Sequence, residues 1–186
     1  LKTGRAAKCI FSRQESFAAG NTRHQTRVRV RLGLDRQGIV RAAAIDCLEN
    51  AGAYGEHSIN VVGLVGRKNL PRCAKAEAVA FTGRVVYTNT VPGGAYRGFG
   101  ATQGCFALES CLDIAAERLG MCPMALRERN LPQVGEVMPS YYGETLTSSS
   151  LARCMARGRE MIGWDTKWPR RQTAPHLVRG VGMALT

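Results

Sequence analysis

Residues 93–100 combine glycine with arginine in a pattern that suits oxyanion binding. They read Gly-Gly-Ala-Tyr-Arg-Gly-Phe-Gly and lie between an expected strand and an expected helix. Glycine has no Cβ, so a backbone rich in it can approach a ligand closely. A helix N-terminus offers unpaired N–H groups and the positive end of a dipole, and Arg97 adds a forked cationic donor. Phosphate or metal-oxo binding is therefore predicted, with a plain strand-to-helix connection as the alternative.

Other chemistries find little support. The spacing matches neither GxGxxG with a downstream acid nor GxxxxGK[ST], which argues against dinucleotide and P-loop sites. The seven cysteines form no CxxC pair, so no zinc site or disulfide framework is indicated, and reduced thiols in a cytoplasm fit best. The histidines are far apart and are predicted to be satisfied or surface residues: His24, His57 and His176. Three cysteines are predicted to be core thiols on apolar helix faces: Cys105, Cys111 and Cys154.

The composition is that of a globular protein, with 45% hydrophobic residues and a net charge of +12. Such a charge permits binding to nucleic acid, an anionic membrane or a phosphate-bearing ligand. The basic residues are scattered along the chain, which favours a solvated surface or a face covered by an acidic partner segment over nucleic acid. The longest apolar stretch, Val61–Val65, is too short to span a bilayer, and a soluble protein is predicted.

The loop must be positioned by strands before it and helices after it. Val28–Leu34 alternates apolar and polar residues, Asp35–Gly38 supplies a turn, and Ile39–Glu49 returns, which predicts a β-hairpin. Residues 52–71 show little periodicity and are predicted to be a looser stretch. A third extended run is expected at Ala78–Tyr87.

Helical periodicity begins at Ala101 and is expected to continue to Leu119, with Gly120 as the C-terminal stop. Two shorter helices are predicted: Met124–Asn130 after Pro123, and one capped by Ser148 and Ser149 that ends at Gly163. The predicted fold class is α+β, with a β-hairpin and further strands packed against these helices. The chain reads as one incomplete region: strand-rich over about 1–92, loop and helices over 93–164, and a further extended segment over 165–186.

Both ends of the sequence look cut. Leu1–Arg5 resembles the last turn of a helix with Gly4 as its stop, and residues 180–186 resemble a buried strand.

The order of motifs resembles one enzyme family. Thr88-Asn89 and residues 94–103, GAYRGFGATQ, resemble the TN…GAFRGFGxPQ signature of xanthine dehydrogenases and aldehyde oxidases, the molybdenum hydroxylases. Residues 109–130 resemble the family's E…D.xA..LG..P..LR..N, and upstream Thr3–Arg5, residues 12–17 and Arg23-His24 resemble TGRPV…xReExf…RH. The matches cover nearly the whole chain. Thr102 replaces the usual proline and Tyr96 the usual phenylalanine, and neither change removes a backbone donor.

The resemblance implies part of an oxidoreductase that hydroxylates an N-heterocycle, such as the purines xanthine or hypoxanthine, or an aldehyde, with water as the oxygen source. A molybdenum–molybdopterin cofactor would be bound through these residues of the loop: Gly94, Ala95, Tyr96 and Arg97. Phe99 would stack on the substrate and Arg67 would orient it.

No side chain in this chain is expected to ligate metal or act as the catalytic base. The family's GGGFGGK loop would lie upstream of Leu1 and its catalytic glutamate beyond Thr186. Iron–sulfur clusters and FAD are expected on other domains or subunits. The alternatives are a basic nucleic-acid-binding module and an inactive fragment of the enzyme.

Overall fold

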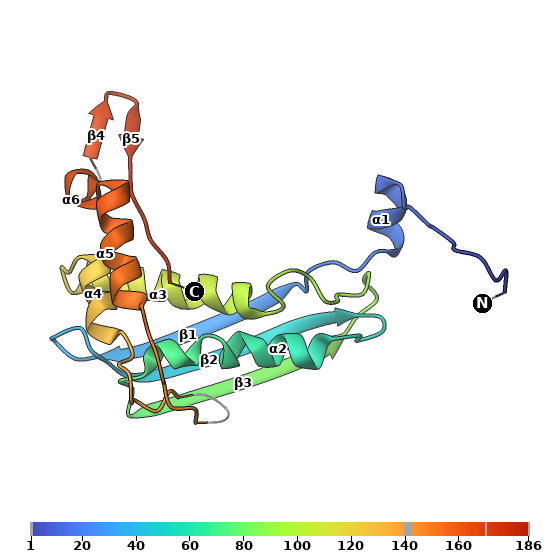
Figure 1. Cartoon of the computed structure of the whole chain (residues 1–186), viewed down its shortest axis with the longest axis horizontal. Coiled ribbons are helices and arrows are strands. Elements are labelled where there is room, and N and C mark those ends of the chain that lie inside the picture. The colour runs from blue at the N-terminus through green and yellow to red at the C-terminus, as the bar shows by residue number, and fades with distance from the viewer. Residues whose placement is uncertain (1, 140–142, 170, 186) are drawn as a thin grey trace.

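The base of the fold is a three-stranded sheet of order β1-β2-β3 (Figure 1). The structure is a computed structural model that describes residues 2–139, 143–169 and 171–185. β1 (Thr26–Leu34) pairs antiparallel with β2 (Val40–Gly52), and β2 pairs parallel with β3 (Ala78–Tyr87). The predicted hairpin, the third extended run and the α+β class are confirmed.

One face of this sheet is covered by two helices, α2 (Ser58–Arg67) and α3 (Ala101–Arg118), which lie along it (Figure 1). The register aligns Val30, Ile45 and Phe81 across the three strands, and all three side chains pack in the core under the helices. The helices contribute further buried core residues: Val62, Val65, Leu108, Leu112 and Ala116. A Cβ at Gly104 would collide with the Val65 carbonyl, so this glycine sets the close α2–α3 spacing.

The opposite face of the sheet is polar and basic. Alternation along β1 places Arg27, Arg29 and Arg31 on it, all exposed. Arg84 of β3 joins them through its pairing with Asp46, at 3.2 Å. The fold thus gathers on one surface several arginines that are dispersed in the sequence.

Two helices lie where the sequence pattern predicted none. Residues 52–71 contain α2 and a 3-10 turn over Leu70–Cys73, so the prediction of a looser stretch is wrong. Gly63 and Gly66 weaken the helical pattern, yet the face that carries Val61, Val62 and Val65 is buried, and tertiary packing overrides the low propensity. Upstream, a capping box from Ser12 and Glu15 starts α1 (Arg13–Ala19), which buries no residue.

The helices after the loop follow the prediction closely. α3 is followed by Gly120 and α5 (Leu151–Ile162) by Gly163, both in the left-handed conformation, at φ 63° and 65°. α4 spans Pro123–Asn130. The N-cap of α5 is Ser150, which makes no side-chain capping hydrogen bond, whereas the predicted residue Ser149 accepts from the N–H of Leu151 at 3.4 Å.

The C-terminal part stands off the sheet at the end opposite α1 (Figure 1). It contains α5, α6 (Trp164–Lys167) and a small hairpin of β4 (Arg171–Ala174) and β5 (Leu177–Arg179). A second apolar cluster is built there from Met124, Leu131, Met155 and Trp164, with Val181, Met183 and Leu185 packed against it.

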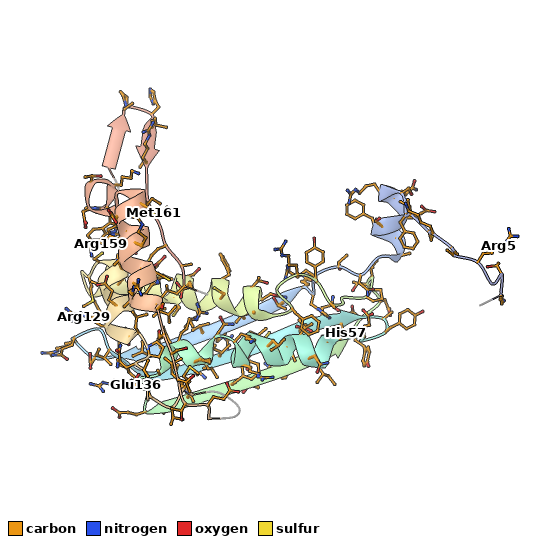
Figure 2. All side chains as sticks on the ribbon, in the orientation of Figure 1. Arg5, His57, Arg129, Glu136, Arg159 and Met161 are labelled. Carbon is orange, nitrogen blue, oxygen red and sulfur yellow. The ribbon has the colours of Figure 1, made fainter. Side chains whose placement is uncertain are left out.

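Two predictions about these outer segments are wrong. Residues 180–185 form no strand, although every second side chain packs on the second cluster. Cys154 is exposed, because the side of α5 that it shares with Met161 turns to solvent. Met161, labelled in Figure 2, is 74% exposed. The expected helix end at residues 1–5 is only partly tested, because Leu1 lies outside the described residues; residues 3–5 form a bend in which Gly4 is left-handed, at φ 61°.

None of the helices in the part of the chain that the structure describes is both long and apolar enough to cross a membrane.

Candidate functional site

The glycine-rich loop, residues 93–100, connects β3 to α3 as predicted and is held by backbone hydrogen bonds. Gly93 donates to the carbonyl of Ala51 at 3.1 Å, and Gly94 donates to the carbonyl of Thr22 at 3.0 Å. Thr22 also forms an isolated parallel bridge with Gly93. The loop is therefore fixed to the end of β2 and to the segment that precedes β1.

The glycines of the loop are required by packing inside the chain. A Cβ at Gly93 would overlap the ring of His24, one at Gly94 would overlap Glu56 and Asn21, and one at Gly100 would overlap the carbonyl of Val61. At these positions, other atoms of this protein approach the loop backbone closely because glycine has no Cβ. The sequence pattern predicted that these glycines let a ligand approach the backbone. The structure shows instead that they let the loop pack against α2 and the 21–24 segment.

Three consecutive residues of the loop have backbone N–H groups without a partner among the described residues. Among the residues that the structure describes, the N–H groups of Ala95, Tyr96 and Arg97 make no hydrogen bond, and all three residues are exposed. The Arg97 side chain makes no ion pair with any described carboxylate. Adjacent backbone donors beside an unneutralised guanidinium are an arrangement that binds anions.

Phe99 adopts a backbone conformation that bulky residues rarely occupy. Its φ is 43°, between Gly98 at 95° and Gly100 at 89°. Two successive turns hold it: Phe99 donates its N–H to the Tyr96 carbonyl at 2.8 Å, and Ala101 donates to Gly98 at 2.9 Å. Such strain persists only where the surroundings enforce it and is common at functional sites. The Phe99 ring contacts His57 edge-on, with centroids 5.8 Å apart. Figure 2 shows His57 at the end of the sheet that lies nearer α1.

An open groove of about 780 Å³ runs beside Phe99 and brings the two predicted substrate residues together. Phe99 lies at one part of its lining and Arg67, exposed at the end of α2, at another. The rest of the lining is mostly apolar: Ile59, Asn60, Gly63, Leu64, Leu70, Val79, Phe81 and Pro139. The loop residues Ala95, Tyr96 and Arg97 do not line this groove.

A buried polar cluster under the loop was missed by the sequence reasoning. His24, Glu49 and Ser58 are 4%, 0% and 1% exposed. The Nε2 of His24 lies 2.9 Å from the Ser58 Oγ and 3.5 Å from a Glu49 oxygen. A signal was present: Glu49 follows Ile45 and Cys47 at strand spacing, so alternation already placed this carboxylate on the buried face.

Burial controls the titration of this cluster. It raises the pKa of the Glu49 carboxyl to about 7 and lowers that of His24, while the nearby carboxylate of Glu56 partly opposes the second shift. Serine and glutamate both approach the same ring nitrogen of His24, whereas a serine nucleophile relay needs them on opposite nitrogens. The cluster therefore supports the loop and is not arranged as a hydrolytic triad.

Glu49→Gln is expected to raise the thermal midpoint relative to the unchanged protein at pH 8 and to change it much less at pH 5. A carboxyl whose pKa moves from 4.5 unfolded to about 7 folded binds more protons in the folded state, so its folded state loses stability as pH rises through that window. Melting curves from pH 5 to 8 measure this, with Asp46→Asn on the same strand as the control. A midpoint difference that stays constant with pH would contradict it.

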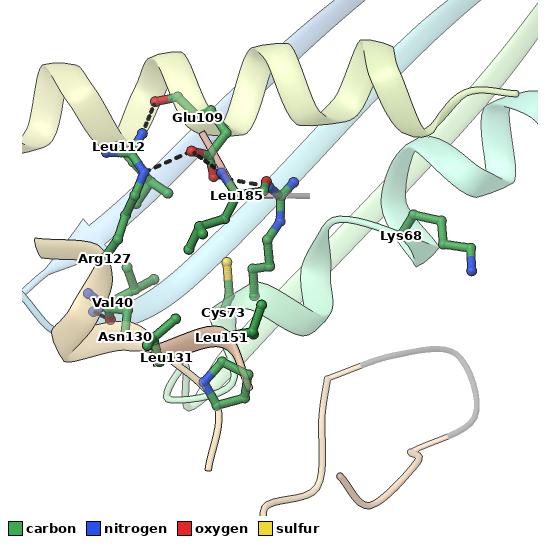
Figure 3. A pocket seen from close by; sticks show the side chains of 12 residues that line it. Val40, Lys68, Cys73, Glu109, Leu112, Arg127, Asn130, Leu131, Leu151 and Leu185 are labelled. Carbon is green, nitrogen blue, oxygen red and sulfur yellow. Dashed lines mark hydrogen bonds and ion pairs between the residues drawn. The ribbon is translucent and has the colours of Figure 1, made fainter. Parts of the chain in front are cut away.

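A second, smaller cavity of about 90 Å³ lies beside Glu109 and Leu112 of α3 (Figure 3). Its polar wall is Glu109, which accepts from Arg72 at 2.9 Å and from Arg127 at 2.7 Å. Arg72 also donates to the Leu185 carbonyl, and the Leu185 N–H donates to Glu109 at 3.1 Å. These contacts tie the 180–185 segment to the core.

Metal-binding side chains do not gather anywhere in the described residues: no group of three or more His, Cys, Asp or Glu could hold an ion. Burial raises the pKa of Cys47 to about 12 and that of Cys73 to about 11, which makes both thiols poor nucleophiles. Cys105 and Cys111 are half-buried on α3.

Comparison with known proteins gives this geometry a context. Residues 1–131 match the family model described as "Molybdopterin cofactor-binding domain". A xanthine dehydrogenase molybdenum-binding subunit of Escherichia coli O157:H7 is 36% identical over 185 residues, which cover 97% of this chain and 24% of that protein. Aldehyde oxidase 2 of Cavia porcellus is 30% identical over 156 residues, 84% of this chain and 12% of that protein.

Solved structures agree in fold. The aldehyde oxidoreductase of Desulfovibrio desulfuricans superposes with a TM-score of 0.71 at 30% identity, covering 79% of this chain and 16% of that one. Quinoline 2-oxidoreductase of Pseudomonas putida superposes with a TM-score of 0.70 at 28% identity, covering 84% and 20%. The chain spans about a quarter or less of the length of these relatives.

Proposed function

Because the chain belongs to the molybdopterin cofactor-binding domains of the molybdenum hydroxylases, we propose that Ala95, Tyr96 and Arg97 bind a molybdenum–molybdopterin cofactor in an oxidoreductase that hydroxylates flat N-heterocycles. Gly94, also expected from the sequence to contact the cofactor, is buried and its N–H donates to Thr22. The observation that carries this proposal is the run of N–H groups at Ala95, Tyr96 and Arg97 that have no partner among the described residues. They fit the oxygen-rich periphery of such a cofactor, and Arg97 adds a forked charged donor.

When bound, the cofactor supplies the two-electron oxidation and the transfer of an oxygen atom that comes from water. This chain's residues supply binding and orientation. The loop N–H groups and Arg97 hold the cofactor's edge, and Phe99 presents its ring to the substrate. Arg67 lines the same groove. Iron–sulfur and FAD domains or subunits receive the electrons, and a cytoplasmic location fits the seven free cysteines.

The groove supports a heterocyclic substrate over an aliphatic one. Apolar walls and the Phe99 ring favour a flat, weakly polar molecule, while Asn60 and Arg67 offer donors for ring nitrogens or carbonyl oxygens. Purines and quinoline-like rings share these features, whereas small aldehydes present no face to stack.

Phe99→Ala in the full-length enzyme should reduce kcat/KM for a purine or quinoline by about 5- to 10-fold more than for a short aliphatic aldehyde, because an aromatic pair contributes about 1 kcal/mol beyond area burial. Steady-state kinetics on both substrate types measure this, with Phe106→Ala on the exposed side of α3 as a matched control. Label from ¹⁸O-water should enter the product. Equal losses for both substrate types, or oxygen drawn from O₂, would contradict the proposal.

A nucleic-acid-binding module is the second candidate, and the basic open face of the sheet favours it. Arg27, Arg29 and Arg31 project from that face at every second residue of β1. Phosphate contacts weaken steeply as salt rises, so filter binding of duplex DNA and of RNA across salt concentrations tests it. Absence of binding at low salt removes this candidate.

A further inference from the structure

The segment before β1 runs directly beside the glycine-rich loop. The Thr22 N–H donates to the Pro92 carbonyl at 3.4 Å, and its carbonyl accepts from Gly94 at 3.0 Å. Two residues further along the chain, the ring of His24 fills the space that a Cβ of Gly93 would need. Arg23 lies between these two anchor residues, so its backbone is fixed next to the loop.

The guanidinium of Arg23 joins the two limbs that flank Phe99, which are the glycine-rich loop up to Arg97 and the first turn of α3. Nη2 donates to the carbonyl of Arg97 on the limb before Phe99, and Nη1 donates to the Thr102 hydroxyl at 2.7 Å on the limb after it. Gln103 accepts from the same Nη1 at 3.4 Å. The guanidinium carbon also lies 4.8 Å from the centroid of the Tyr96 ring, in cation–π geometry.

Two features separate this arginine from an ordinary surface residue. Its side chain makes no ion pair with any carboxylate that the structure describes, so its donors go to neutral acceptors and its charge stays unneutralised beside the loop. Its acceptors come from positions 97 and 102, on either side of the strained turn at Phe99. A planar fork spans both limbs at once, which a lysine ammonium on one flexible stem does not reproduce.

We propose that Arg23 is a positioning residue, which sets the separation of the two loop limbs and thereby fixes both the unpaired N–H groups of residues 95–97 and the ring of Phe99. It acts through the loop and does not itself touch substrate. Its charge adds to that of Arg97 in drawing an anionic group to the loop. This inference rests on the proposed cofactor-binding function of the loop.

The test uses the full-length enzyme with Arg23→Ala and Arg23→Lys, and with Arg29→Ala on the open sheet face as the matched loss of an arginine. Molybdenum content per chain after dialysis and the rate of cofactor release are measured first, then kcat and KM. Arg23→Ala should release cofactor roughly tenfold faster, because it loses charged hydrogen bonds to the loop. Arg23→Lys should recover little of this, and Arg29→Ala should match the unchanged enzyme.

Two further measurements separate positioning from general stability. Millimolar guanidinium should restore part of the cofactor retention of Arg23→Ala, while ammonium at the same concentration should not. Thr102→Val should weaken retention in the unchanged background and have no added effect in Arg23→Ala.

Normal cofactor retention by Arg23→Ala, or early melting without any effect of guanidinium, would overturn the proposal. If Arg97→Ala also retains cofactor normally, the proposed function of the loop fails as well. If only Arg23→Ala is normal, the positioning role alone fails.

Discussion

Glu109→Ala should lower the free energy of unfolding by about 3–5 kcal/mol, because Arg72 then has no carboxylate partner among the described residues and Arg127 keeps only Asp113. Arg127 is 1% exposed and Arg72 15%, and both donate to the Glu109 carboxylate, itself 7% exposed (Figure 3). The same carboxylate accepts from the backbone of Leu185. Since small domains are stable by about 5–15 kcal/mol, this loss is a large share of the total.

The second acidic partner of Arg127 provides a matched control. Asp113 contacts the same guanidinium at 2.8 Å, but its side chain is 52% exposed. Asp113→Ala should therefore cost no more than about 1 kcal/mol, as solvent-exposed pairs do. Denaturant unfolding of both variants measures the difference. Equal losses would show that burial of the Glu109 pair does not determine its contribution.

Local sequence patterns predicted the elements whose structure depends on residues close together in the chain. The hairpin of β1 and β2 follows from alternation around the Asp35–Gly38 turn, and Gly120 and Gly163 correctly predicted where α3 and α5 end. Glycine in the left-handed conformation is a strong local requirement, so one residue type carries the information. These features need no knowledge of distant contacts.

The missed features depend on contacts between distant residues. α2 contains Gly63 and Gly66, which lower helix propensity, and only its packing against β3 and α3 explains why it is helical. Cys154 was expected in a core because its helix has an apolar face, yet that face is exposed in this chain. Periodicity identifies an apolar face but not the partner that covers it.

The candidate site, too, was predicted where local patterns sufficed and missed where it depends on distant contacts. Composition and order pointed to residues 93–100, and the structure adds which donors are unpaired and that the glycines serve internal packing. Arg23 was noted only as part of a family pattern, and His24 otherwise only as a satisfied or surface histidine. Their contacts span 69 or more residues of sequence, from position 24 to Gly93 and from position 23 to Arg97. No local pattern encodes a contact of that range.

Arg97→Ala should weaken cofactor retention in the full-length enzyme by about 10- to 100-fold, corresponding to about 1.5–3 kcal/mol for a charged hydrogen bond, and leave the cofactor-free protein as stable as before. The side chain is exposed and makes no ion pair with a described residue. The Arg97 carbonyl that Arg23 holds belongs to the backbone and survives the substitution. Removing the side chain therefore breaks no hydrogen bond or ion pair with the residues that the structure describes.

Molybdenum content and thermal midpoint, each with and without cofactor, separate binding from stability. Arg97→Lys keeps the charge and loses the fork, so it should fall between alanine and the unchanged residue. Arg29→Ala, on the open sheet face, controls for a general loss of positive charge. An Arg97→Ala variant with full molybdenum content and an early midpoint in both states would make Arg97 a structural residue. That result would place the cofactor's anionic contacts elsewhere than on this loop.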